Sequence, residues 1–403
     1  MKKLIALVLA AVMLFGLIAC GATTETNTPA TEGSETAANG ETIKIALITN
    51  TTGDYAMYGV PVHNAALIYF NEINEAGGIN GKKLEVLEYD DKADGVESVN
   101  AFNLAMDKGI TAVLGSVLTG ATIALADATY DANVPQITAS ATAAGVTMLE
   151  PDKADSEIRT NVFRSCFIDP FQGTKMAQYA VEKFGAKTAA IFFESGSDYS
   201  EGVKAAFEAE AQNLGLEVVA VEAFGTGDKD YKAQMTNIAA KNPDVVFMPI
   251  YYGEAGLAIT ALRAAGSSAI CIGGDGFGSV KDYASAEDLE GTVYCSGYAK
   301  GTEDVKDFEE KYLATYGEEV PNMFAPLAYD AAMLLVEGLK AAEAQGLTAG
   351  TDEYKQATID AIKATDGLKG ITGTYSFDEF NNPIKSAAII ELSGGEELFK
   401  ETF

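Results

Sequence analysis

Hydroxyl side chains stand at two turns where an expected strand gives way to the next element. The first turn is Ser116-Val117-Leu118-Thr119-Gly120, between an expected strand at 111–114 and an expected helix at 120–132. The second is Ser140-Ala141-Thr142, after an expected strand at 135–138. In open α/β sheets ligands bind beyond the carboxyl ends of strands, where the free N–H groups and the dipole of a helix N-terminus attract an anion. These turns predict an anion site whose natural guest is a carboxylate.

The common catalytic arrangements are not matched. The single histidine, His63, falls in an expected helix at 59–76, and no GxSxG occurs, which argues against a Ser-His-Asp hydrolase. The P-loop motif is not matched. Gly81-Lys82 is followed by Lys83 rather than Ser or Thr, and the upstream position that requires glycine is occupied by Ala76. Carboxylate pairs are plentiful, but no spacing selects a glycosidase-type pair. The chain is therefore not expected to be an enzyme.

The cysteines and the charge exclude two further classes. After Cys20 three cysteines remain, Cys166, Cys271 and Cys295, and no pair has CxxC spacing, so neither a metal site nor a cofactor is expected. Cys271 and Cys295 fall in neighbouring expected strands, which leaves a disulfide open, although buried free thiols are the favoured interpretation. A formal net charge of −30 repels phosphate backbones, so nucleic-acid binding is not expected.

The secondary-structure elements that would position these turns alternate between strands and helices along the chain. Up to residue 138, strands are expected at 43–48, 84–89, 111–114 and 135–138, with helices at 59–76, 95–108 and 120–132. The rhythm restarts after residue 164, with strands at 188–193, 216–221, 244–250, 269–273 and 292–296 and helices at 171–184, 199–213, 231–240 and 254–265. Strands separated by single helices imply parallel βαβ units with right-handed crossovers.

The last third of the chain breaks this rhythm. Helices are expected at 303–316, at 325–345 and near 352–364, followed by a β-rich segment at 373–392 with a turn at 377–383. The body from residue 43 onward is about 360 residues, which is large for one hydrophobic core. The pattern therefore predicts an α/β protein with two doubly wound, parallel-sheet lobes.

The N-terminal segment is typical of an exported protein. Lys2 and Lys3 precede an apolar run from Leu4 to Ile18, which is shorter than the roughly 20 residues that span a bilayer and fits a signal peptide. The run ends in LIACG, which resembles a bacterial lipobox whose Cys20 carries the lipid; the alternative is a plain secretory signal with an incidental cysteine.

A tether is expected between this signal, residues 1–20, and the body. Residues 21–42 are rich in Thr, Ala, Glu and Gly and bury too little apolar surface to offset their chain entropy, so we expect them to be disordered. Such a spacer would hold the body at the outer face of the cytoplasmic membrane by the lipid alone.

Seven short motifs occur in a specific order along the body. They are GDYAMYG at 53–59, NEINEAGGINGKKL at 71–84, YDD at 89–91, VLGS at 113–116, PQITASAT at 135–142, LRAAG at 262–266 and YDA at 329–331. From about residue 43 to the end, this ordered set resembles the leucine/isoleucine/valine-binding protein family. These are amino-acid substrate-binding proteins of ABC transporters with the type I periplasmic binding fold.

The resemblance implies two lobes that are joined by three crossover strands and bind a ligand in the cleft between them. The crossings would fall near 163–167, 293–296 and 373–376. The N-terminal lobe would then comprise 43–163 plus 297–373, and the C-terminal lobe 164–296 plus 374–403.

The resemblance also assigns ligand contacts on the N-terminal lobe. Thr119 matches a hydroxyl residue that binds the ligand carboxylate. The position of Ser140 offers a backbone carbonyl to the ligand ammonium, and that of Thr142 offers a hydroxyl and an N–H. Tyr58 and Phe324 are expected to form apolar pocket wall.

On the other lobe, Tyr199 and Tyr251 resemble cleft tyrosines of the family, and Asp275 resembles the acidic residue that pairs with the ligand ammonium. The leucine-type members usually carry Glu there, so the shorter Asp puts an identical substrate in doubt. Each assignment has a plain alternative: a helix cap for Thr119, turn residues for Ser140, Thr142 and Asp275, and rim or core aromatics for Tyr199 and Tyr251.

The function that follows is capture of a free amino acid, branched-chain or otherwise small and neutral, for the permease and ATPase subunits of an ABC importer. A second hypothesis keeps the same module but makes it a sensor that presents its ligand to a membrane receptor. Gene neighbourhood or a co-purifying partner would separate the two.

Overall fold

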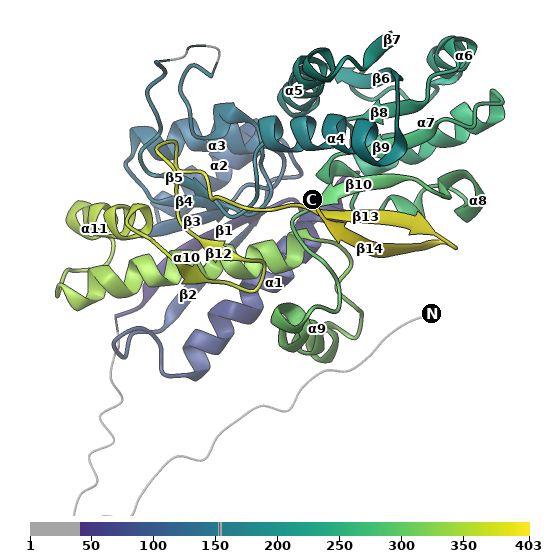
Figure 1. Ribbon diagram of the computed structural model, residues 1–403. Coiled ribbons are helices and arrows are strands. Elements are labelled where there is room, and N and C mark those ends of the chain that lie inside the picture. Colours follow the sequence, from purple (N-terminus) through teal and green to yellow (C-terminus); the bar gives the residue numbers. More distant parts are fainter. Residues whose placement is uncertain (1–40, 152, 154) are drawn as a thin grey trace, which may run out of the picture. The chain divides into compact units, whose positions relative to one another are not determined.

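The computed structural model describes residues 41–151, 153 and 155–403, so the expected signal peptide, Cys20 and nearly all of the expected tether lie outside the described residues. The described body contains two large sheets (Figure 1). In the described part of the chain, no helix combines the length and the apolar character needed to cross a membrane.

The first sheet is five-stranded and wholly parallel, with the order β2-β1-β3-β4-β5. Its strands are β1 (Ile43–Thr49), β2 (Leu84–Asp90), β3 (Ala112–Gly115), β4 (Gln136–Thr138) and β5 (Val162–Arg164).

Alternating side chains of β1 bury both faces of this sheet. Ile43, Ile45 and Leu47 belong to the core that contains residues of α1 (Ala56–Glu75) and α10 (Phe324–Ala344). Ala46 and Ile48 pack with residues of α2 (Gly95–Met106) and α3 (Thr119–Asp131). A fifth helix, α11 (Asp352–Lys363), packs on α10. We call this sheet with these five helices the first lobe.

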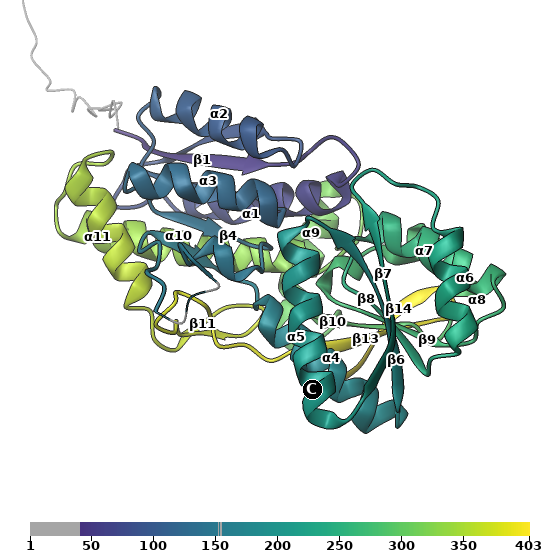
Figure 2. The same cartoon turned by 90° about the horizontal axis from the view of Figure 1, so that it is seen from above.

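The second sheet is seven-stranded, with the order β14-β13-β10-β9-β8-β6-β7. Its parallel part comprises β6 (Thr188–Ser195), β7 (Glu217–Gly225), β8 (Val245–Met248), β9 (Ile270–Gly273) and β10 (Val293–Ser296). Helices α4 (Asp169–Phe184) and α5 (Asp198–Leu214) lie on one face, and α6 (Lys232–Lys241), α7 (Tyr252–Ala264) and the short α8 (Ala286–Leu289) on the other (Figure 2). This sheet and these helices form the second lobe.

The second sheet also has an antiparallel edge beside its parallel part. β13 (Ala388–Ser393) runs antiparallel to β10, and β14 (Glu396–Thr402) runs antiparallel to β13. Gly394 and Gly395 have φ of 62° and 87° and form the two-residue turn of this hairpin, a conformation that favours glycine. β14 was not expected because its charged, largely exposed sequence lacks the apolar pattern of a strand with a buried face.

The chain passes between the two lobes three times: after β5, after β10, and between β12 (Thr374–Tyr375) and β13. Among the described residues β12 pairs only with β11 (Leu368–Lys369), in a small separate sheet. α9 (Glu303–Tyr316) follows the second passage. The segment expected to cross at 293–296 is β10 itself, which is hydrogen-bonded within the second sheet.

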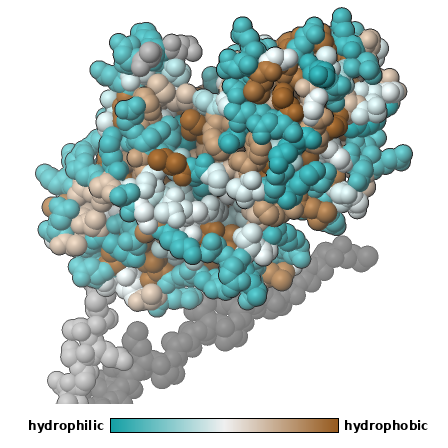
Figure 3. Space-filling model, viewed as in Figure 1, coloured by the Kyte–Doolittle hydropathy of each residue, from teal (hydrophilic) through white to brown (hydrophobic). Residues whose placement is uncertain are grey.

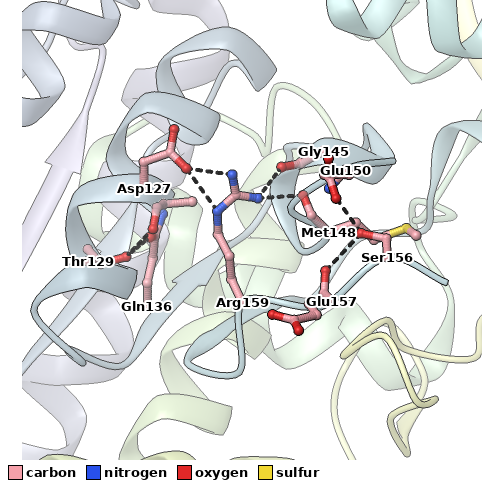
Figure 4. Close-up of polar contacts among 10 residues, drawn as sticks. Asp127, Thr129, Gln136, Gly145, Met148, Glu150, Ser156, Glu157 and Arg159 are labelled. Carbon is pink, nitrogen blue, oxygen red and sulfur yellow. Dashed lines mark hydrogen bonds and ion pairs between the residues drawn. The ribbon is translucent and has the colours of Figure 1, made fainter. Parts of the chain in front are cut away.

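A buried arginine fixes the long connection between β4 and β5 (Figure 4). The guanidinium of Arg159 donates to Asp127 Oδ1 on α3 at 2.5 and 3.1 Å, and to the carbonyl oxygens of Gly145 and Met148, each at 2.6 Å. These bonds tie the part of the connection that follows the turn at 140–142 to α3.

The structure shows whether the three described cysteines are paired. Within the described residues Cys166, Cys271 and Cys295 are buried free thiols, so the favoured interpretation of unpaired cysteines is confirmed. Burial raises the pKa of Cys166 to about 12 and that of Cys271 to about 11, which keeps both thiols protonated and unreactive at neutral pH.

The face in Figure 3 is mostly hydrophilic, consistent with a net charge of −30.

Candidate functional site

A single small cavity is lined by every residue that the sequence predicted to contact a ligand. It lies between residues of the two lobes. The predicted residues around it are Tyr58, Thr119, Ser140, Thr142, Tyr199, Tyr251, Asp275 and Phe324; Val117, Leu118 and Gly276 complete the lining. The tertiary structure thus brings together residues that span 266 positions of the chain, while their roles in binding remain predictions.

One wall of the cavity is the N-terminus of α3. This helix begins at Thr119, one residue earlier than expected, and Leu118 is its extended N-cap residue. Within the described chain no side chain caps this end, so the Thr119 hydroxyl is not a helix cap and that alternative is wrong. The first amides of a helix have no carbonyl one turn before them, and they attract an anion together with the helix dipole.

The turn at 140–142 forms the adjoining wall and is held rigidly from behind. Ser140 Oγ donates to the carbonyl oxygen of Val117 at 2.7 Å. The fully buried Arg164, on β5, donates to the carbonyl oxygens of Ala141 at 2.9 Å and Ala143 at 3.0 Å. Thr142 Oγ1, in contrast, is buried and has no hydrogen-bond partner among the described residues. An orphaned hydroxyl facing a cavity is available to a ligand.

Asp275 approaches from the second lobe at the start of a short 3₁₀ turn, Asp275–Phe277. Its backbone N–H donates to Gln172 Oε1 at 2.9 Å, and the N–H of Gly276 donates to the Tyr199 hydroxyl at 3.0 Å. Asp275 Oδ1 is buried without a hydrogen-bond partner in the described part of the protein. Burial raises the pKa of this carboxyl to about 6, against the opposing effect of hydrogen bonds with Tyr199 and Gln172, so the group is ionised at neutral pH.

The glycines that flank Asp275 are required by close packing. A Cβ on Gly274 would lie 2.5 Å from Gln172 Oε1 and 2.8 Å from the Tyr199 hydroxyl oxygen. A Cβ on Gly276 would lie 2.5 Å from the carbonyl oxygen of Ile250. Larger residues at either position would displace the carboxylate that they bracket, so the Gly-Asp-Gly sequence is more than a turn signal.

Aromatic rings from both lobes close the remaining sides. Tyr199 and Tyr251 stack with their ring centroids 5.0 Å apart and an interplanar angle of 7°. Tyr58 on α1 meets Tyr251 edge-on at 5.8 Å and Phe324, the first residue of α10, at 4.8 Å. Burial raises the pKa of Tyr58, Tyr199 and Tyr251 well above the usual value, so these hydroxyls stay neutral. The three hydroxyl groups are therefore polar but uncharged groups at the cavity.

Sequence reasoning missed the residues that support Asp275 from behind. Gln172 binds the Asp275 backbone although 103 positions separate them, and its Nε2 donates to Asp169 Oδ1 at 3.0 Å. Both Asp169 and Gln172 are buried on the first turn of α4. The available signal was a polar residue, Gln172, on the apolar stripe of a helix that was expected at 171–184.

Polar groups of different character line the two sides of the cavity. No group of three or more His, Cys, Asp or Glu side chains suited to a metal ion occurs within residues 41–151, 153 and 155–403. The cavity instead combines anion-binding amides and an orphaned hydroxyl on one lobe with an unpaired carboxylate on the other. Such an arrangement complements a small molecule that carries one negative and one positive group.

Comparison with known proteins agrees with this geometry. The family model for periplasmic binding proteins matches residues 42–396. A Leu/Ile/Val-binding protein, BraC3 of Rhizobium johnstonii, is 31% identical over 84% of this chain and 88% of its own length. A leucine-, isoleucine-, valine-, threonine- and alanine-binding protein of Pseudomonas aeruginosa is 29% identical over 84% of this chain and 86% of its own length.

A solved structure extends the similarity to the fold. The branched-chain amino acid transporter substrate-binding protein LivJ of Streptococcus pneumoniae, in complex with isoleucine, superposes with a TM-score of 0.79 at 32% sequence identity. The match covers 90% of this chain and 99% of that one. The resemblance and the two-lobed α/β fold expected from the sequence are thereby confirmed.

Proposed function

Because the chain belongs to the Leu/Ile/Val-binding family of periplasmic binding proteins, a family of binding proteins and not of enzymes, we propose that it captures a free amino acid for an ABC importer. The preferred ligand is a branched-chain or other small neutral amino acid. The observation that carries this proposal is the pairing of an orphaned hydroxyl, Thr142 Oγ1, with an unpaired buried carboxylate, Asp275 Oδ1, at one cavity.

The carboxylate of the ligand docks at the first lobe. Thr119, the first residue of α3, and Thr142 both line the cavity, and their hydroxyls and the leading amides of α3 are neutral donors. Hydrogen bonds to a charged group contribute about 1.5–3 kcal/mol each when they replace water, so two or three donors suffice to hold a carboxylate. This end of the site also rejects ligands that lack an acidic group, because the orphaned donors would remain unpaired.

The ammonium of the ligand docks against Asp275 and the backbone carbonyl of Ser140. A buried carboxylate without a partner is costly, and a ligand cation repays that cost on binding. Since an isolated aromatic acid such as benzoate carries no cation, it would leave Asp275 uncompensated. The two ends together select a zwitterion.

The side chain of the ligand meets an apolar wall. Tyr58, Leu118 and Phe324 are buried and carry no charge, so this wall favours a small aliphatic group over a charged side chain. The names of the Rhizobium and Pseudomonas relatives, which include leucine, isoleucine and valine, support the same ligand class.

The place of the protein is outside the cytoplasmic membrane. The signal-like segment with its lipobox-like end predicts a lipid on Cys20, and the tether would hold the body near the permease. Partners are the permease and ATPase subunits. Purification with crosslinking separates import from sensing, because recovery of a chemoreceptor or kinase in place of these subunits would favour the sensor hypothesis.

Isothermal titration with a panel of ligands tests the proposed specificity. The panel contains leucine, isoleucine, valine, alanine and threonine, with leucinamide, isovalerate and benzoate as analogues that lack one of the two charges. We expect the branched-chain amino acids to bind most tightly, and both leucinamide and isovalerate to bind at least 100-fold more weakly, about 2.7 kcal/mol. Binding of benzoate or an amide in preference to every amino acid would contradict the proposal.

A further inference from the structure

A second buried carboxyl group, Asp169, joins the two halves of the cavity from behind. Its backbone N–H donates to the carbonyl oxygen of Thr142 at 3.0 Å, which ties it to the first lobe. Its Oδ1 accepts from Gln172 Nε2 at 3.0 Å, and Gln172 Oε1 accepts from the Asp275 backbone at 2.9 Å. One residue therefore contacts the predicted carboxylate-binding turn through its backbone and, through its side chain and the Gln172 amide, the predicted ammonium-binding residue.

The other carboxyl oxygen of Asp169, Oδ2, accepts no hydrogen bond of good geometry from the described residues. Within the described residues Asp169 Oδ2 and Thr142 Oγ1 are both buried and both without a hydrogen bond of good geometry, although the two groups are neighbours that interact. Asp169 is only 1% exposed, and a Cβ on Gly202 of α5 would lie 2.9 Å from its Oδ2. Water therefore does not solvate this oxygen freely, and α5 presents no charge at this point.

The surroundings favour the protonated form. Burial raises the pKa of Asp169 to about 8 and outweighs the hydrogen bonds with Thr142 and Gln172, which lower it; the like charge of Asp275 raises it further. The Arg164 guanidinium acts in the opposite direction, but its terminal nitrogens are engaged with the carbonyl oxygens of Ala141 and Ala143. The other titratable groups that interact with Asp169 are buried and neutral at pH 7, namely Cys166, Cys295, Tyr199 and Tyr251.

We propose that Asp169 is a positioning residue that keeps its proton at neutral pH and donates it in a hydrogen bond to Thr142 Oγ1. This bond would satisfy both orphaned oxygens and direct the Thr142 hydroxyl proton toward the ligand carboxylate. Through Gln172 the same carboxyl holds the backbone of Asp275. The inference rests on the proposed function, since it assumes a zwitterionic ligand at this cavity.

Neutral Asp169 also matches the charge of the site to its ligand. With Asp275 alone ionised, the cavity offers one negative charge to one ammonium. Were both carboxyls ionised, two negative charges would face that ammonium, and the site would favour dications over neutral amino acids. The protonated form of Asp169 therefore acts as a determinant of specificity for ligands with a single cation.

The test compares the wild-type protein with Asp169→Asn by isothermal titration with L-isoleucine at pH 7, 8 and 9. An Asn amide reproduces a neutral acid, because it accepts from Gln172 and donates to Thr142 but cannot ionise. We expect equal affinities at pH 7. From pH 7 to 9 the wild type should lose about tenfold more affinity than the variant, as Asp169 ionises. The ammonium of the probe titrates equally in both proteins and cancels. Asp131→Asn, an exposed change at the opposite end of α3, is the control and should follow the wild type.

Identical pH profiles for the wild type and Asp169→Asn would overturn the proposal, because a merely structural role does not depend on ionisation. A ¹³C NMR titration of the Asp169 carboxyl carbon in ligand-free wild-type protein, assigned by its absence in Asp169→Asn, gives an independent measurement. We expect a midpoint well above the usual Asp value of about 3.9, and a midpoint near 3.9 would also overturn the inference. If L-isoleucine fails to bind at any pH, the proposed function is in question, while the NMR titration still decides whether Asp169 keeps its proton.

Discussion

The hydroxyl of Tyr58 donates a hydrogen bond of 2.5 Å to the carbonyl oxygen of Gly276, 218 positions further along the chain. The same hydroxyl accepts a bond of 3.2 Å from the backbone N–H of Tyr252. Tyr58 lies on α1 in the first lobe, and both partners lie in the second. One phenol oxygen therefore bridges the two lobes beside Asp275, at the edge of the predicted ligand site.

Removal of this hydroxyl should weaken the closed arrangement. Tyr58→Phe keeps the ring and its contacts with Tyr251 and Phe324 but leaves a buried N–H and a buried carbonyl unpaired between the lobes. We expect the affinity for L-isoleucine to fall by about 1–3 kcal/mol, or roughly 5- to 150-fold, in isothermal titration. Tyr69→Phe, on the same helix but packed within the first lobe against Tyr329, is the control. Unchanged affinity in Tyr58→Phe would mean that the bridge does not contribute to closure.

Removal of the Asp275 carboxylate should reduce both affinity and closure. In Asp275→Ala the buried ligand ammonium loses its ionic partner, at a cost of roughly 2–5 kcal/mol. A ligand shifts a conformational equilibrium only through contacts that it makes better in one state. Small-angle scattering at saturating ligand should therefore give a larger radius of gyration for the variant complex than for the wild type. Normal binding and full closure would reduce Asp275 to a turn residue.

The affinity should fall as the solution is acidified below neutrality. Burial raises the pKa of Asp275 to about 6 in the ligand-free protein, and protonation removes the negative charge that attracts the ligand ammonium. From pH 7 to pH 5 we expect the affinity to decrease, approaching tenfold per pH unit below pH 6. The carboxylate of the ligand remains ionised over this range. Asp275→Asn should bind weakly at all three of pH 7, 6 and 5, and a wild-type affinity that is constant over this interval would contradict the ionic role of Asp275.

The same carboxylate should destabilise the ligand-free protein at neutral pH. Its folded pKa is above the unfolded value of about 3.9, so its favourable contribution to folding is complete below pH 4 and is lost as the pH rises through 6. Asp275→Asn removes this ionisation and should raise the free energy of unfolding by about 1–3 kcal/mol at pH 7. Denaturant unfolding without ligand measures the change, and at pH 4 the difference between the two proteins should shrink. A less stable variant at pH 7 would show that the carboxylate is compensated within the protein.

Membrane attachment should depend on Cys20, which lies outside the described residues. Cys20→Ser removes the sulfur that would carry the lipid, so the protein should appear in the soluble fraction or keep its uncleaved signal segment. Fractionation followed by mass determination distinguishes these products from the lipidated form. A variant that is processed and still membrane-bound would place the anchor elsewhere.

Local sequence patterns determined the elements, the fold class and the two hydroxyl-bearing turns of the cavity. Apolar segments of strand length that alternate with amphipathic helices specify parallel βαβ units, because each pattern matches the burial period of one kind of element. The hydroxyl residues at the ends of β3 and β4 could be placed at one edge of a sheet on the same grounds. The roles of Tyr199, Tyr251 and Asp275 came from ordered family motifs and not from periodicity.

The tertiary structure alone decided how these residues are supported. The bonds from Tyr58 to Gly276 and from the Asp275 backbone to Gln172 join positions 218 and 103 apart. The first depends on how α1 of the first lobe meets the second lobe, and the second on how α4 packs within the second lobe. No local period encodes such a contact, because hydrogen bonds require atoms to meet within a few tenths of an ångström after both elements have folded. The raised pKa of Asp169 has the same origin, since burial and the approach of Asp275 exist only in the folded chain.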